Sequence, residues 1–125
     1  MIILDYKDRR PIYEQIMERF QELMMTGVLE KDSQLPSVRS LAMELSINPN
    51  TIQRAYGELE RQGYTYSVKG KGNFVADNDH IKQSKKEALY KRQRELAREG
   101  LLVGVEKERL IEAIHQIYDK EGNDR

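Results

Sequence analysis

The sequence predicts a mainly α-helical protein with a small β-hairpin, arranged as a winged helix-turn-helix followed by a two-helix C-terminal module. Three observations predict this fold class. Two short amphipathic helical segments are separated by only a tight turn, two β-prone segments joined by a glycine-rich turn follow them, and long polar helical segments come last. We therefore expect a winged helix-turn-helix domain over residues 1–76 and a helical tail over residues 77–125.

The composition limits the classes of protein to consider. The chain has 125 residues, of which 38% are hydrophobic and 34% charged, and it has no cysteine, which excludes disulfides and cysteine-based zinc sites. Basic and acidic residues number 21 each, which is mild evidence against nonspecific coating of nucleic acid but allows a local basic patch. No signal peptide is recognisable, and no apolar run approaches the roughly 20 residues of a membrane span, so we expect a cytoplasmic protein.

The first two helices of the domain have clear start and stop signals. Pro11 suits the first turn of a helix, an apolar stripe runs from there to Met24, and Gly27 is a plausible stop. A second, short helix is expected after the N-cap Ser37 and ends near Ser46. Only a few residues separate it from the next helix, as in a helix-turn-helix.

The third helix is predicted most clearly, because Asn48 is a favourable N-cap and Pro49 fits the first helical position. Apolar residues at i, i+3, i+4 and i+7 hold one face down, whereas the opposite face is polar. Asparagine and glutamine pair well with adenine, arginine with guanine or phosphate, and threonine with phosphate or a thymine methyl. This pattern is typical of a DNA recognition helix, although solvated surface and capping would also explain it. The candidate contacts are Asn50, Thr51, Gln53 and Arg54.

Two further segments extend the candidate DNA surface. Arg39 lies off the apolar face of the second helix, where it can reach base edges or phosphate, and Ser37 can serve both as a cap and as a phosphate donor. Each of these residues alone is more simply a solvated side chain; their position beside the helix-turn-helix favours DNA contact. The same holds for the turn between the β-prone segments, whose glycines allow close approach and whose lysines can neutralise phosphates. This turn consists of Lys69, Gly70, Lys71 and Gly72.

The tail is expected to contain two helices. A very polar helix runs from about His80 to Glu99, ends at Gly100, and leads through an apolar connector into a helix from Glu106 to about Lys120. Seven basic and two acidic residues between positions 82 and 98 give that stretch a net charge of +5; we interpret it as a solvated helix face, with phosphate contacts as the alternative. The last helix has an apolar face that is expected to pair with a second copy, consisting of Leu110, Ile111, Ile114, Ile117 and Tyr118.

No group of residues supports an enzyme. His80 and His115 are far apart and lack a ligand pattern such as H-E-x-x-H, and the glycine-rich turn has neither the spacing nor the strand-to-helix context of a P-loop. We therefore predict no catalytic residue, no metal site and no cofactor.

The motifs together resemble the GntR family of bacterial transcription regulators, and the short tail is similar to that of the YtrA-type subfamily. The resemblance covers roughly residues 6–76 and implies a winged helix that binds operator DNA as a dimer, usually as a repressor. It implies base contacts from Arg39, from the start of the recognition helix and from the glycine-rich turn, and dimerisation through the two tail helices. The matching stretches are 11–16, 27–29, 35–42, 48–56, 59–60, 63 and 69–75.

We therefore predict a sequence-specific, homodimeric repressor whose recognition helices enter successive major grooves of a pseudo-palindromic operator. The expected partners are double-stranded operator DNA and a second copy of the chain, with no membrane partner. The sequence leaves open whether a small-molecule effector binds at the junction between wing and tail. The alternative from another class is a protein-interaction adaptor built on a winged helix without DNA readout, and the neutral net charge is its main support.

Overall fold

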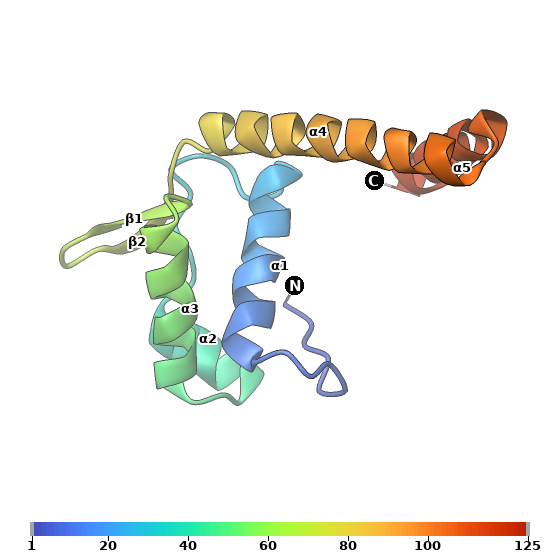
Figure 1. The fold of residues 1–125 in the computed structure, drawn as a ribbon. Coiled ribbons are helices and arrows are strands. Elements are labelled where there is room, and N and C mark those ends of the chain that lie inside the picture. The colour runs from blue at the N-terminus through green and yellow to red at the C-terminus, as the bar shows by residue number, and fades with distance from the viewer. Residues whose placement is uncertain (1, 125) are drawn as a thin grey trace. The chain divides into compact units, whose positions relative to one another are not determined.

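The computed structural model describes residues 2–124, with Met1 and Arg125 outside this range, and it divides into two compact units, one ending at Lys82 and one beginning at Gln83 (Figure 1). The fold class is confirmed: the described residues are mainly helical with one small antiparallel hairpin. In chain order the elements are α1 (Ile12–Met25), α2 (Val38–Leu45), α3 (Pro49–Arg61), β1 (Thr65–Val68), β2 (Gly72–Val75), α4 (Asp79–Val103), α5 (Lys107–Glu121) and a final 3-10 turn, η1 (Gly122–Asp124).

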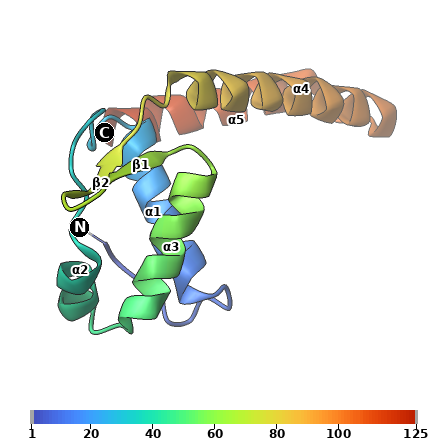
Figure 2. The same ribbon diagram turned by 90° about the vertical axis from the view of Figure 1, so that its left-hand side faces the viewer.

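The core of the first unit lies between its three helices and the base of the hairpin. Figure 2 shows α1 and α3 side by side, and α3 packs against both α1 and α2. The aromatic rings of Phe20 and Tyr56 meet edge to face with centroids 5.6 Å apart. The hydroxyl of Tyr56 donates a 2.7 Å hydrogen bond to the carbonyl oxygen of Pro36, so that α3 is also tied to the start of α2. The largest fully buried side chains are Phe20, Ile16, Leu41, Ile52, Leu59 and Val75.

The predicted helix caps are confirmed. The Ser37 hydroxyl accepts a 3.0 Å hydrogen bond from the amide of Ser40, and the Asn48 side chain accepts one of 2.8 Å from the amide of Asn50. Ser46 adopts a left-handed conformation with φ 55° and ends α2, which leaves a tight turn before α3. These local interactions set the geometry of the helix-turn-helix.

The hairpin pairs in a regular antiparallel register, with Thr65 opposite Val75 and Val68 opposite Gly72. Its tip needs glycine, because Gly70 and Gly72 have φ values of 78° and 125°. The sequence did not predict that the loop before α2 also pairs with the hairpin. The amide of Leu35 donates to the carbonyl of Asn73 at 2.9 Å, and the two segments form an isolated bridge between Gln34 and Phe74.

The predicted end of the tail's first helix at Gly100 is wrong. Helix α4 continues to Val103, and the chain turns only at Gly104, where φ is 83°. Gly100 is buried inside the helix because the following turn folds back on it: a Cβ there would lie 3.5 Å from Cβ of Val105 and 3.6 Å from Leu110. The glycine therefore permits close packing within the second unit instead of ending the helix.

The two compact units divide inside α4, after Lys82, whereas the predicted domain boundary lies at residue 76. Ile81, in the first turn of α4, packs against the core of the first unit, so the start of this helix belongs to the first unit. The division into a DNA-binding domain and a dimerisation tail stays a prediction. Among residues 2–124, no helix is both long and apolar enough to span a membrane.

Candidate nucleic-acid interface

The N-terminal half of α3 presents its predicted reading residues on the surface. Asn50, Gln53 and Arg54 are exposed and Thr51 is half-buried, whereas the opposite face of the helix is buried in the core. Burial of that face fixes the helix, so the polar residues are held in one orientation. This arrangement suits the reading of base edges in a major groove.

Arg54 contacts an aromatic ring that the sequence did not connect with it. Its guanidinium carbon lies 3.8 Å from the centre of the Tyr13 ring, which comes from the first turn of α1. A guanidinium above an aromatic face is attracted by the ring quadrupole, and the stacking limits the positions that the side chain takes. The sequence placed Tyr13 in the apolar stripe of α1, and no short-range signal pairs residues so far apart.

A hollow of about 460 Å³ lies where the N-terminal ends of α1 and α3 meet. The first turn of α1 has no side-chain cap, so its leading amides remain available, and helix N-termini favour anions. Arg54 adds a positive charge, and no carboxylate lines the hollow. These features suit a DNA phosphate. The lining residues are Pro11, Ile12, Tyr13, Asn48, Asn50, Thr51 and Arg54.

The predicted cationic contacts are free of ion pairs. Among the ion pairs that the structure shows for residues 2–124, none involves Arg39, Arg54, Lys69 or Lys71. Arg39 is exposed on α2. The capping hydroxyl of Ser37 only accepts a hydrogen bond from the Ser40 amide, so the hydrogen of this hydroxyl can still be donated to a phosphate.

Arg61, about two turns beyond the reading residues, differs from these cations. It forms a two-pronged pair with Glu58, with a shortest distance of 2.7 Å. The hydrogen bonds of this pair lower the pKa of Glu58 and raise the pKa of Arg61. Arg61 is therefore already neutralised by its own helix.

The wing is held by contacts at its tip and along its strands. The side chain of Gln34 donates a 2.7 Å hydrogen bond to the carbonyl of Lys71, so the lysine- and glycine-rich turn is tied to the loop before α2. The hydroxyl of Tyr66 donates to Asp32 at 2.8 Å, which raises the pKa of that tyrosine. The rings of Tyr66 and Phe74 stack with centroids 5.6 Å apart. Lys69, Gly70 and Lys71 are exposed, and Gly72 is half-buried.

Glu60 joins the wing to the recognition helix. Its carboxylate accepts a 3.1 Å hydrogen bond from the amide of Ser67 in β1 and a second one from the Ser67 hydroxyl. Between α3 and the wing lies a groove of about 360 Å³. The groove is lined by Gln53, Tyr56, Gly57, Glu60, Ser67, Val68, Gly70, Lys71, Gly72 and Asn73.

The chain is similar to known proteins over most of its length. A family model described as "Bacterial regulatory proteins, gntR family" matches residues 12–75. The chain belongs to the GntR family. It is 36% identical over 119 residues to the HTH-type transcriptional repressor YtrA of Bacillus subtilis, which covers 94% of this chain and 92% of YtrA. The predicted family and the YtrA-type resemblance are thereby confirmed.

Solved structures place this GntR-family chain among DNA-binding transcription regulators. A transcriptional regulator from Oenococcus oeni matches with a TM-score of 0.71 at 33% identity, over 94% of this chain and 98% of that one. The DNA-binding domain of AraR in complex with operator ORE1 matches with a TM-score of 0.53 at 32% identity, over 61% of this chain and 93% of that one. The chain is a DNA-binding transcription regulator, in a family of regulators rather than enzymes.

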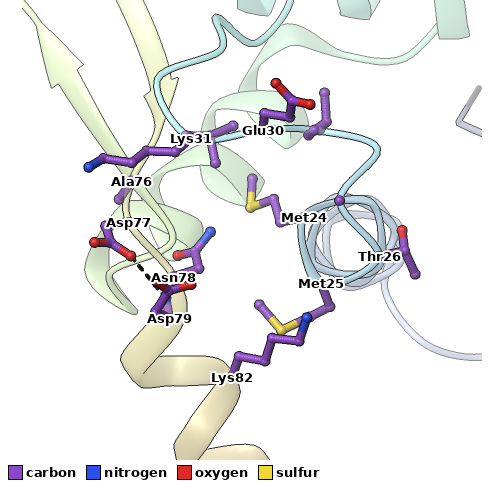
Figure 3. A pocket seen from close by; sticks show the side chains of 13 residues that line it. Met24, Met25, Thr26, Glu30, Lys31, Ala76, Asp77, Asn78, Asp79 and Lys82 are labelled. Carbon is purple, nitrogen blue, oxygen red and sulfur yellow. Dashed lines mark hydrogen bonds between the residues drawn. The ribbon is translucent and has the colours of Figure 1, made fainter.

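A second hollow, of about 420 Å³, is lined by none of the predicted DNA contacts. It lies between the end of α1, the end of β2 and the start of α4 (Figure 3), all within the first unit. Met24 and Val75 are buried in its wall, and the carboxylates of Glu30, Asp77 and Asp79 lie around it together with Lys31 and Lys82. The side-chain oxygen of Asn78 is buried and has no hydrogen-bond partner.

Proposed function

We propose that the protein represses transcription as a homodimer bound to a pseudo-palindromic operator, with Arg39 and the start of α3 in the major groove and the wing on adjacent backbone or minor groove. The observation that carries this proposal is the unpaired polar and cationic surface formed by α2, α3 and the wing. Hydrogen bonds with Gln34 and Glu60 hold the wing in place, so DNA binding costs little conformational entropy in the wing.

The second unit supports dimerisation. On α5, Ile111 and Ile114 are 45% and 46% exposed, Ile117 is 54% exposed, and Tyr118 is 74% exposed. Leu110 is half-buried, because it packs on Gly100. Helix α4 adds a stripe of exposed residues seven positions apart, Leu89, Leu96 and Val103, which the sequence prediction did not include. An apolar surface of this kind is typical of an interface with a second copy.

The test of the proposed function is binding to the DNA upstream of the protein's own operon. Fluorescence anisotropy with this fragment should give a saturable, salt-dependent affinity, and the Arg39→Ala, Arg54→Ala double variant should bind at least about tenfold more weakly. Lys120→Ala, on exposed α5, is the matched control and should bind as wild type. An adaptor would show no salt-dependent DNA binding, and the double variant would then change nothing.

We further infer that the hollow beside Met24 is the effector site. A ligand with an apolar body would contact Met24 and Val75, and an N–H or O–H group on it would donate a hydrogen bond to the carboxylate of Asp77 or Asp79. Phenethyl alcohol is a suitable probe, because aromatic rings also contact methionine sulfur favourably. Its titration should shift the amide resonances of Met24 and Val75 saturably in wild type and much less in the Asp77→Ala, Asp79→Ala double variant. Equal shifts in both would remove the assignment.

A DNA-binding regulator works where the chromosome is, so we place the protein in the cytoplasm, without a membrane partner.

A further inference from the structure

Gly57 occupies the middle of the recognition helix without a packing reason. It has ordinary helical backbone angles, and a Cβ built on it would meet no atom within 4 Å. Glycine lowers the stability of a helix interior more than any residue except proline. The rest of α3 has strong helix signals, including a capping side chain from Asn48 and Pro49 at the start. The fold itself would therefore be more stable with alanine at this position.

The other glycine in a helix interior of the described residues shows the contrast. Gly100 lies against Val105 and Leu110, where a side chain would crowd the turn that follows. Glycines at the turns have positive φ values, for example 83° at Gly27 and 86° at Gly63. Gly57 has neither property, so no contact or backbone angle within residues 2–124 accounts for it.

The surroundings of Gly57 indicate what approaches it. It is exposed and lines the groove between α3 and the wing, one turn after Gln53 and three residues before Glu60. The opposite wall contains two more glycines and the unpaired Lys71. The Glu60 carboxylate is engaged by the amide and hydroxyl of Ser67, which reduces its repulsion of an anion.

We propose that Gly57 is a close-approach position for the DNA backbone. One sugar–phosphate strand lies in the groove, with a deoxyribose against the bare helix backbone at Gly57 and a neighbouring phosphate beside Lys71. Base contacts come from the start of α3. The same sugar–phosphate strand then passes the following turn of α3, at Gly57, as it leaves the major groove. This inference rests on the proposed function, because it takes operator DNA as the occupant.

The test separates stability from binding. Gly57→Ala should raise the melting temperature by about 4 °C, since nothing crowds the new methyl group. It should nevertheless weaken binding to the upstream DNA fragment about tenfold, and Gly57→Gln should weaken it further. Ser84→Ala, on exposed α4, is the control for gained helix propensity and should leave binding unchanged.

The outcomes are distinguishable. If wild type binds the fragment and both Gly57 variants bind equally well, the close approach is refuted and the proposed function stands. If wild type itself does not bind in a salt-dependent way, both proposals fall together. A lower melting temperature for Gly57→Ala would instead assign the glycine a role in the fold and overturn the inference.

Discussion

The guanidinium of Arg54 stacks on the ring of Tyr13 at 3.8 Å, and this contact links the first turn of α1 to the reading face of α3. A cation on an aromatic face at an exposed site is worth about 0.5–1 kcal/mol. The contact limits the positions of the arginine before DNA binds. Tyr13 thus positions Arg54 without needing to touch DNA itself.

Removing this aromatic ring should weaken DNA binding modestly. Tyr13→Leu keeps the apolar volume and loses the cation–π contact, so we expect operator affinity to fall about two- to fivefold. Tyr13→Phe retains the ring and should bind as wild type, because the tyrosine hydroxyl makes only a 3.3 Å hydrogen bond with Glu14. Anisotropy titrations at one salt concentration measure both variants. Equal loss in both would show that the hydroxyl, and not the ring, matters.

Replacing Glu60 should loosen the wing. Glu60→Ala removes both hydrogen bonds that Ser67 donates to α3, so the Ser67 amide should exchange with solvent faster. Operator binding should also weaken, since the wing must then be ordered on binding. Glu60→Gln keeps a hydrogen-bond acceptor, so its Ser67 exchange rate and its operator affinity should lie between those of wild type and Glu60→Ala. Unchanged exchange at Ser67 in Glu60→Ala would contradict this role.

Substitutions of Lys71 and of Arg39 should weaken DNA binding in different ways. Lys71→Ala removes a phosphate contact, so it should weaken binding on all DNA sequences and lower the salt slope by about one unit. Arg39→Ala removes a base contact and should reduce the preference for the operator over unrelated DNA. Affinities on both DNAs at several salt concentrations separate the two effects. A sequence-independent loss with Arg39→Ala would reassign that residue to the backbone.

The pair of Glu58 and Arg61 should give a small, pH-dependent stability. Because Arg61 lowers the pKa of Glu58 in the folded state, the stabilisation is present above the ordinary glutamate value of 4.5 and is lost as the pH falls through the lower, folded value. Arg61→Gln should therefore melt slightly below wild type at neutral pH, and the two melting curves should converge in acid. If the melting temperatures of the two proteins converged as the pH was raised, the pH dependence would have the opposite sign and the pairing would be refuted.

Charges on the apolar face of the tail should produce monomers. The Ile114→Asp, Ile117→Asp double variant should sediment as a monomer and bind the operator weakly, because each half-site alone is a poor target. Leu96→Asp should act similarly if the exposed stripe of α4 belongs to the same interface. Glu112→Gln, on the same helix, is the control. An unchanged dimer in the double variant would place the interface elsewhere.

Local chemistry explains which features could be predicted from the sequence. Ser37, Asn48 and Pro49 act within one helical turn, and the glycines of the wing meet a local need for positive φ, so short-range rules were sufficient. Contacts between distant segments could not be predicted in this way. Gly100 had the appearance of a helix stop until the packing of Leu110 on it was known.

The same limit applies to the candidate interface. The position of Arg54 on its helix predicts contact with DNA, but its partner Tyr13 belongs to another helix and cannot be found from sequence spacing. Gln34 lies in the loop before α2, and only the fold shows that its side chain holds the wing tip. Gly57 lies outside the i, i+3, i+4, i+7 apolar pattern of α3, but only the surrounding atoms show that nothing packs against it.

The pairing of the loop before α2 with the hairpin has a consequence for how DNA specificity can change. Gln34 and Leu35 hold the wing at Lys71 and Asn73, and the same loop leads within a few residues to Arg39. Transplanting a foreign wing alone would break this pairing and disturb the approach to the second helix. The loop and the wing therefore form one structural unit, and a chimaeric regulator would need both segments from the same parent protein.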